Sequence, residues 1–249
     1  DLKPFSALKC YGMSAITALT AQNTIGVQAI QGVPPEFVKA QIDSVLSDIG
    51  VDVVKTGMLN SIDVIQIVSK AITHYNISNI VVDPVMFAKS GDLLIEDSAM
   101  ESLLLDLIPL ARVLTPNLLE AEKLLNKTLK TTKNIETAAR ELSELGPSAV
   151  IIKGGYSNDA MSNDCVFIKE SSQKEKVFWL KQKRIETNNI QGSGCTFSSA
   201  VAAFLAHSLL LEEAIITAKN YITQAILSSQ PWKMGSGKGP VDHFFNILE

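Results

Sequence analysis

Cysteine is scarce in this sequence, which has only Cys10, Cys165 and Cys195 among its 249 residues. An odd number of widely separated cysteines does not suggest a disulfide framework and is typical of a reducing compartment. The 3 histidines are scattered, and none has a cysteine or histidine neighbour at zinc-ligand spacing. We therefore expect a cytoplasmic protein with neither a disulfide framework nor a structural zinc site.

Long apolar runs and a surplus of one charge are also missing. The longest unbroken apolar stretch runs from Ala200 to Ala206, far short of the roughly 18 residues of a membrane-spanning helix. The formal net charge is -4, with no excess of lysine and arginine to neutralise a phosphate backbone. The 46% of hydrophobic residues excludes a disordered chain. We expect a soluble, folded protein that binds neither membranes nor nucleic acid.

Short β-branched apolar segments alternate with longer amphipathic segments, which predicts an α/β fold with a mostly parallel central sheet and helices on both faces. No linker, repeat or composition shift divides the sequence, which favours a single domain over residues 1–249. The predicted strands are Ser14 to Thr20, Val51 to Thr56, Asn79 to Val82, Arg112 to Thr115 and Ala149 to Lys153, followed by a hairpin of Cys165 to Lys169 and Lys176 to Lys181. The predicted helices are Glu36 to Ile49, Ile62 to Ile72, Ser98 to Leu107, Ile135 to Leu145, Cys195 to Ala206 and Glu212 to Ser228.

A glycine-rich turn, Gly192-Ser193-Gly194-Cys195, runs directly into one of these predicted helices. Glycine lets the backbone approach a ligand closely, and the N–H groups of a first helical turn attract an anion. Cys195 falls within that turn, where the helix field can lower the pKa of a thiol. The turn is therefore a candidate catalytic site. The alternatives are an ordinary tight turn and a buried, unreactive cysteine.

Polar side chains follow three of the predicted strands. Lys153 precedes Gly154-Gly155 at one strand end, Asp83 opens the sequence Asp83-Pro84-Val85-Met86 at another, and Thr115-Pro116-Asn117 leads to Glu120 at a third. Open α/β sheets bind ligands at the carboxyl ends of their strands, where a lysine suits a phosphate and carboxylates suit magnesium. The structural alternatives are a solvated lysine, a strand terminator, turn prolines and a helix cap.

These motifs occur in the order and spacing of the hydroxymethylpyrimidine phosphate kinases, which the sequence resembles up to Pro240. The likeness extends to Asp1 to Ala7, Tyr11-Gly12, Ala18 to Thr24, Lys55 to Leu59 and Ala88 to Asp92. It implies a ribokinase-like three-layer fold and an ATP-dependent kinase of thiamine biosynthesis. Such an enzyme phosphorylates 4-amino-5-hydroxymethyl-2-methylpyrimidine and then its monophosphate. The resemblance also implies Mg²⁺ as cofactor and a homo-oligomer, a dimer.

The resemblance further implies roles for individual residues. Gln22 would hydrogen-bond the aminopyrimidine, with Met58 and Val85 packed on its ring. The turn Gly192-Ser193-Gly194-Cys195 would surround the transferred phosphoryl group, with Cys195 where ribokinase relatives carry an aspartate as general base. The residues expected to contact ATP are Lys153, Thr115, Asn117, Gly235, Gly237 and Gly239, and those expected near Mg²⁺ are Asp83 and Glu120.

The sequence departs from the family pattern in a few places. Ile190-Gln191 stands where the family usually has Thr-His before the glycines, and Tyr156 replaces the usual His after Lys-Gly-Gly. The family's first strand and glycine-rich substrate loop would lie before Asp1, so we expect part of the pyrimidine pocket to come from residues preceding it.

Three alternatives to this function stay open. A pyridoxal kinase would phosphorylate a similar hydroxymethyl arm on a heteroaromatic ring. A dinucleotide-binding oxidoreductase is disfavoured, because the Gly-x-Gly lies late in the chain and lacks a further glycine three residues on. A binding protein without activity is disfavoured by Lys153, Glu120 and Cys195 together.

Overall fold

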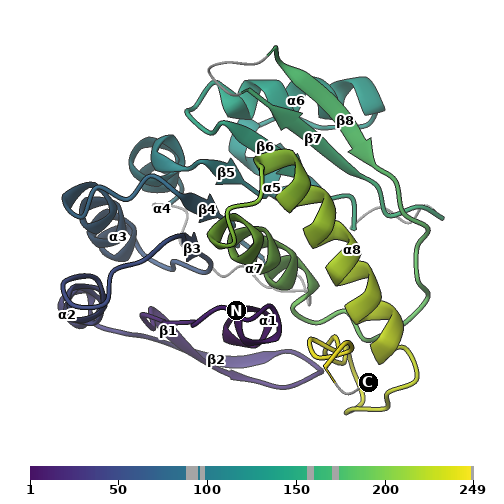
Figure 1. Ribbon diagram of the computed structural model, residues 1–249, viewed down its shortest axis with the longest axis horizontal. Coiled ribbons are helices and arrows are strands. Elements are labelled where there is room, and N and C mark those ends of the chain that lie inside the picture. The colour runs from purple at the N-terminus through teal and green to yellow at the C-terminus, as the bar shows by residue number, and fades with distance from the viewer. Residues whose placement is uncertain (88–94, 96–98, 156–159, 170–173, 248–249) are drawn as a thin grey trace.

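A computed structural model describes residues 1–87, 95, 99–155, 160–169 and 174–247 (Figure 1). Its centre is a six-stranded sheet with the order β3-β4-β5-β6-β7-β8. The strands β3 (Val54–Thr56), β4 (Ile80–Val82), β5 (Val113–Leu114) and β6 (Ala149–Ile152) run parallel, and β7 (Asp164–Ile168) and β8 (Lys176–Leu180) form the predicted antiparallel hairpin at one side. The parallel strands bring their carboxyl ends to one edge, as the sequence predicted.

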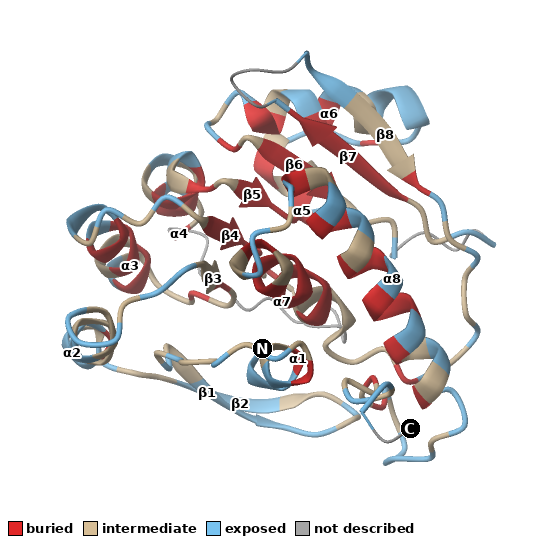
Figure 2. Ribbon diagram, in the orientation of Figure 1, coloured by how far each residue is buried: buried red, intermediate tan, exposed pale blue. Residues whose placement is uncertain are grey.

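Helices cover both faces of the sheet, because successive strand side chains point to opposite sides. Ile80 and Val82 pack into one apolar cluster, whereas Val81 between them packs into the other. Figure 2 shows the strands β4 to β7 as a continuous buried layer. The first cluster is covered by α2 (Pro35–Leu46), α3 (Ile62–His74), α4 (Ala99–Ser102), α5 (Leu118–Leu125) and α6 (Thr132–Ser143), and the second by α1 (Leu2–Ala7), α7 (Ser193–Ala206) and α8 (Leu211–Ser229). The expected three-layer fold is confirmed.

The helices that surround the sheet begin in different ways. Side chains of Ser61, Asn117 and Thr131 accept backbone N–H groups and so cap α3, α5 and α6. In contrast, α7 begins after Gly192, whose φ of 77° is in the left-handed region, and within the described chain no side chain caps it. The Ser193 N–H donates to the Ile190 backbone oxygen at 3.2 Å and that of Thr196 to Gly192, so among the described residues the N–H groups of Gly194 and Cys195 are the ones left for another partner.

The predicted strand Ser14 to Thr20 is wrong in position and partner. The strand β1 (Ala18–Gln22) begins later and pairs antiparallel with β2 (Val27–Gly32), which the sequence analysis missed. This hairpin lies below the main sheet beside α1 (Figure 1) and is largely exposed (Figure 2). Its turn is closed by Asn23, whose side-chain oxygen accepts the Ile25 N–H at 2.9 Å.

The predicted helix Ser98 to Leu107 is also modified. After the short α4, the chain continues as a π-helical turn, η1 (Leu103–Leu107), and a 3₁₀ turn, η2 (Ile108–Leu110), which contains Pro109. Proline has no N–H to continue a helical ladder. The other five predicted helices are confirmed, with ends shifted by a few residues. Of the predicted motifs, Ala88 to Asp92 and Tyr156 lie outside the described residues.

None of the described helices is long and apolar enough to cross a bilayer.

Candidate active site

A cavity of about 430 Å³ opens at the carboxyl edge of the parallel strands, between the β1–β2 hairpin and the helices α7 and α8. It brings together most of the residues that the sequence predicted for a site. Its lining includes Gln22, Met58, Asp83, Val85, Asn117, Glu120, Lys153, Gly192, Ser193, Gly194 and Cys195. Thr115 lies just behind this surface, where its hydroxyl contacts Asp83 at 3.3 Å.

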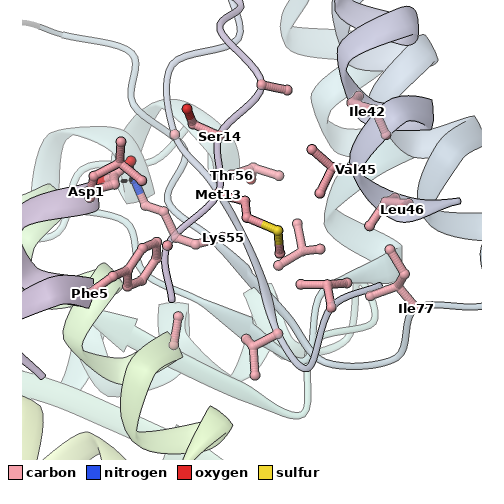
Figure 3. Close-up of a pocket in the computed structure, with 18 of the residues that line it drawn as sticks. Asp1, Phe5, Met13, Ser14, Ile42, Val45, Leu46, Lys55, Thr56 and Ile77 are labelled. Carbon is pink, nitrogen blue, oxygen red and sulfur yellow. Dashed lines mark hydrogen bonds and ion pairs between the residues drawn. The ribbon is translucent and has the colours of Figure 1, made fainter. Parts of the chain in front are cut away.

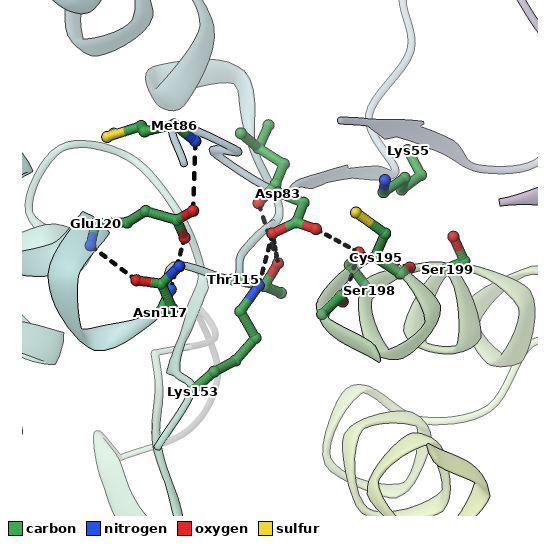
Figure 4. Close-up of polar contacts among 12 residues, drawn as sticks. Lys55, Asp83, Met86, Thr115, Asn117, Glu120, Lys153, Cys195, Ser198 and Ser199 are labelled. Carbon is green, nitrogen blue, oxygen red and sulfur yellow. Dashed lines mark hydrogen bonds and ion pairs between the residues drawn. The ribbon is translucent and has the colours of Figure 1, made fainter. Parts of the chain in front are cut away.

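A buried ion pair forms the centre of the cavity wall (Figure 4). Lys153 Nζ donates to Asp83 Oδ1 at 2.7 Å, and their side chains are 13% and 2% exposed. Ser198, one turn into α7, donates to Asp83 Oδ2 at 3.0 Å. Although burial opposes ionisation, Lys153 holds the pKa of Asp83 below its usual value, and Asp83 in turn raises the pKa of Lys153. Both groups are therefore charged at neutral pH.

Glu120 is the second carboxylate at this edge, and among the described residues none forms an ion pair with it. It forms a capping box with Asn117: Glu120 Oε2 accepts the Asn117 N–H at 2.7 Å, and Asn117 Oδ1 accepts the Glu120 N–H at 2.9 Å. Glu120 Oε1 also accepts the Met86 N–H at 3.3 Å. Burial is the main cause that raises the pKa of Glu120 to about 7, and the charge of Asp83 adds to it. Asn117 and Glu120 thus cap a helix and line the cavity at once.

The amino end of α7 faces Lys153 across the cavity. A Cβ atom added to Gly194 would lie 3.4 Å from Lys153 Nζ, so the absence of a side chain keeps space open beside the ammonium group. The helix dipole and the N–H groups of Gly194 and Cys195 at this end favour an anion. Together the helix end and Lys153 form a site with the charge and geometry to bind a phosphoryl group.

The sequence-based expectation for the Cys195 thiol is wrong. Burial raises the pKa of this thiol above its ordinary value, even though Lys55 and Lys153 act to lower it. The loss of hydration, together with the charge of Asp83, outweighs both lysines. At neutral pH, Cys195 is therefore a thiol rather than a thiolate.

Two further residues of the site were missed by the sequence analysis. Ser198 follows Gly194 by one helical turn and so lies on the same face of α7, which places its hydroxyl on Asp83. Lys55 points toward Cys195 in Figure 4, with a side chain that is only 2% exposed and paired with Asp1 at 2.9 Å. Lys55 lies within β3, whereas Lys153 follows β6, so the strand-end signal that identified Lys153 does not apply to it.

The glycines near the carboxyl terminus lie beside the cavity but do not line it. A Cβ atom on Gly237 would be 2.0 Å from the backbone oxygen of Thr24, and one on Gly239 would be 2.0 Å from Asn189 Oδ1. Gly239 also accepts the Gln191 N–H at 2.9 Å, and Gly237 donates to the Thr24 hydroxyl at 3.2 Å. Gly235 likewise packs on Thr24. The segment thus connects the tip of the β1–β2 hairpin with the glycine-rich turn before α7.

A larger cavity of about 880 Å³ lies on the other side of β3, between α1, α2 and α7 (Figure 3). Its wall is mostly apolar, with Met13, Ile42 and Val45 turned into it. The pair of Lys55 and Asp1 lies at its border. Because Asp83, Glu120, Lys153 and Cys195 all line the smaller cavity instead, we assign the chemistry there.

The sequence pattern of the phosphomethylpyrimidine kinase family matches residues 1–242. The chain belongs to this family. It is 41% identical over 245 residues to the hydroxymethylpyrimidine/phosphomethylpyrimidine kinase of Salmonella typhimurium, covering 98% of this chain and 90% of that protein. It is 46% identical over 243 residues to the thiamine biosynthesis bifunctional protein ThiED of Geobacter sulfurreducens, but spans only 48% of that relative.

A solved structure gives the same fold. The ADP complex of Bacillus subtilis pyridoxal kinase superposes with a TM-score of 0.87 at 33% identity, covering 100% of this chain and 92% of that one. The predicted ribokinase-like fold and the family resemblance are confirmed. Because the chain belongs to the phosphomethylpyrimidine kinase family, it is a phosphotransferase. This result is against two of the alternatives that the sequence left open, the dinucleotide-binding oxidoreductase and the binding protein without activity.

The carboxylates of Asp83 and Glu120 fit a magnesium ion that is also bound by the phosphates of a nucleotide. Within the described part of the chain, no group of three acidic, cysteine or histidine side chains could enclose a metal ion. Asp83 and Glu120 nevertheless lie close together on the cavity wall. Mg²⁺ keeps several waters and binds through one or two carboxylates plus substrate phosphates. The pair therefore fits an ion that arrives with a nucleotide.

Proposed function

We propose that this chain transfers the γ-phosphoryl group of ATP to 4-amino-5-hydroxymethyl-2-methylpyrimidine and then phosphorylates the resulting monophosphate. The observation that carries the proposal is the position of Lys153 opposite the amino end of α7, in the same cavity as Gln22 and Met58. One side of the cavity is suited to a phosphoryl group and the other to a small polar ring. The relatives named above support this choice of substrate.

The substrate side of the cavity is formed by the hairpin and by the loops after β3 and β4. Gln22 is exposed on β1, where its amide can hydrogen-bond ring nitrogens or an amino group. Met58 and Val85 are half-buried and supply apolar contact for a ring. The Thr17 hydroxyl donates to the Met58 backbone oxygen at 2.8 Å, which holds this loop beside the start of the hairpin.

The phosphoryl side provides positioning and charge rather than covalent chemistry, which is what phosphoryl transfer requires. Lys153 and the N–H groups of Gly194 and Cys195 would stabilise charge on the transferring group. The Thr115 hydroxyl donates to Asp83, and Asn117 caps α5 beside it; Thr115 is fully buried and does not line the cavity, so the expected ATP contact is assigned to Asn117 and not to Thr115. Asp83 and Glu120 would hold Mg²⁺, which neutralises phosphate charge when bound.

The two acceptors make different demands on Cys195. A hydroxymethyl group must lose a proton, whereas a phosphate monoester already carries an anionic oxygen at neutral pH, since its second pKa is near 6. We propose Cys195 as the base for the first step only. Its raised pKa makes that step favour alkaline pH.

The test is mass spectrometry of the products formed from ATP, Mg²⁺ and the hydroxymethylpyrimidine. We expect a monophosphate that is converted with time to a diphosphate. Pyridoxal serves as a competing substrate, because the similar solved structure is a pyridoxal kinase. A chain that phosphorylates pyridoxal and leaves the pyrimidine unchanged contradicts the proposal.

We also propose that the chain acts in the cytoplasm as a homodimer. The β1–β2 hairpin exposes Leu19, Ile25 and Ile30 to 59%, 70% and 41%, an unusual density of apolar side chains for a surface strand pair. A second copy would cover them. Light scattering should give twice the chain mass of 26.9 kDa, and Leu19→Lys should shift the protein toward monomer.

A further inference from the structure

A second buried ion pair lines the same cavity, on the side away from the pyrimidine residues. Lys219 of α8 donates through Nζ to Asp164 Oδ2 at 2.7 Å and to the backbone oxygen of Ser162 at 2.8 Å. The two side chains are 10% and 6% exposed. Neither residue belongs to the motifs that indicated a kinase.

The remaining oxygen of Asp164 holds the strand end that carries Lys153. Asp164 Oδ1 accepts the Gly154 N–H at 2.9 Å. Gly154 is also in close contact with Asn163, the residue before β7, since a Cβ atom on Gly154 would lie 1.9 Å from the Asn163 backbone oxygen. One carboxylate thus ties together the end of β6, the start of β7 and the middle of α8.

Stability of the fold does not by itself explain why a buried ion pair such as Asp164–Lys219 is present. Replacing a buried ion pair by apolar residues is often neutral or stabilising, because taking two charges out of water costs as much as their attraction returns. What the pair does provide is a fixed direction for the Gly154 N–H. The residue before Gly154 is Lys153, whose ammonium group must meet a phosphoryl group within a fraction of an ångström to act on it.

We propose that Asp164, with its charge balanced by Lys219, is a positioning residue for phosphoryl transfer. It fixes Gly154 and thereby sets Lys153 opposite the amino end of α7. The inference rests on the proposed function, because it assumes that Lys153 acts on a nucleotide phosphate. Its specific claim is that the hydrogen bond to Gly154, and not the ion pair as such, supports catalysis.

Two double variants separate these effects. Removing either partner alone leaves an unpaired buried charge, which strongly destabilises a fold, so both charges are removed together. Asp164→Asn/Lys219→Met keeps an oxygen for the Gly154 N–H, whereas Asp164→Ala/Lys219→Met removes it. The matched control is Lys176→Met/Glu212→Gln, because this exposed pair also joins α8 to the sheet edge, at 2.6 Å, but lies away from the cavity.

We expect the alanine double variant to lose about 10²-fold in kcat/KM for ATP, the usual cost of a misplaced catalytic group. Its KM for the pyrimidine should match that of the asparagine double variant. The midpoints of thermal unfolding, measured without ADP, should also match. The asparagine variant and the surface control should stay within about fivefold of the parent in kcat/KM for ATP, because the Gly154 N–H keeps an acceptor in both. A fivefold change corresponds to about 1 kcal/mol of transition-state free energy.

Equal losses in the two double variants would overturn the inference, as would a loss shared by ATP and pyrimidine. If the alanine variant does not fold, the asparagine variant decides alone, and a 10²-fold loss there refutes the role of the Gly154 bond. Failure of the proposed function is distinguishable, because the parent would then form no phosphorylated pyrimidine at all. Calorimetric titration with ADP gives a second readout that does not depend on the acceptor.

Discussion

Replacing Lys153 with methionine should damage folding and catalysis together, and a second substitution should separate the two. Lys153 is the close ion-pair partner of Asp83, whose side chain is only 2% exposed. In Lys153→Met, this carboxylate would keep the Ser198 and Thr115 hydroxyls but lose its nearest positive charge. The variant would therefore contain a buried, uncompensated charge.

The expected cost follows from this geometry. Breaking a buried ion pair on one side typically costs about 3 to 5 kcal/mol of unfolding free energy. For a chain of this length, each kcal/mol lowers the thermal midpoint by about 2 to 4 °C, so the midpoint should fall by roughly 10 °C. Loss of one charge-stabilising donor should lower kcat by about 10² to 10³.

Urea denaturation and steady-state kinetics measure the two effects on the same variants. Lys153→Met/Asp83→Asn removes both charges, so it should recover most of the unfolding free energy while kcat stays low. A single variant as stable as the parent would show that Asp83 does not depend on Lys153. A single variant with less than a few-fold loss of kcat would refute the contact with phosphate.

Three further predictions address other parts of the site. Gln22→Ala should raise KM for the pyrimidine by up to about tenfold, which corresponds to the loss of one hydrogen bond. Calorimetry should show an unchanged affinity for ADP. Equal losses of affinity for the pyrimidine and for ADP would indicate misfolding. Glu120 binds its proton more tightly in the folded state, because its pKa is raised to about 7, so its stabilising contribution is complete below its ordinary pKa and is lost as the pH rises toward 7. Urea denaturation from pH 5 to 8 should show this decline, about 3 kcal/mol in full, and Glu120→Gln should abolish it; parallel curves contradict the assignment. The single-turnover rate on the hydroxymethylpyrimidine should rise above neutral pH as Cys195 ionises, by up to about tenfold per pH unit. Cys195→Ala should remove that rise, while the rate on the monophosphate stays flat; a flat parent profile excludes Cys195 as the base.

The sequence predicted most of the residues that line the candidate site, because the relevant signals are local. A β-branched run predicts a strand, and the residue after it lies at the carboxyl edge of a parallel sheet whatever the rest of the chain does. Lys153, Asp83 and Asn117 were found in this way. The three-layer fold followed from the same alternation of strands and helices.

The partners of these residues depend on tertiary structure and could not be predicted. Lys153 and Asp83 are far apart in sequence, and nothing in either motif indicates that they pair. Lys219 lies in an amphipathic helix, where a lysine is normally a solvated residue. The thiol of Cys195 was assigned the wrong direction of pKa shift because a sequence shows the helix end but not the depth of burial. The strand β2 was missed because both of its faces are largely exposed, which removes the alternation that marks a strand.

Burial at the carboxyl edge of the sheet explains why this site would bind a phosphate and a divalent cation together. The ammonium group of Lys153 has three donors, so it can keep Asp83 and still donate to a phosphate oxygen. Burial raises the pKa of Glu120 to about 7 even though the charge of Lys153 acts to lower it, so the ionised carboxylate is only partly compensated. A cation held between Glu120 and the phosphates would supply that compensation and favour the carboxylate. If a nucleotide entered with Mg²⁺, Glu120 would give up its proton to bind the cation, so binding would release a proton and would strengthen as the pH rises through 7.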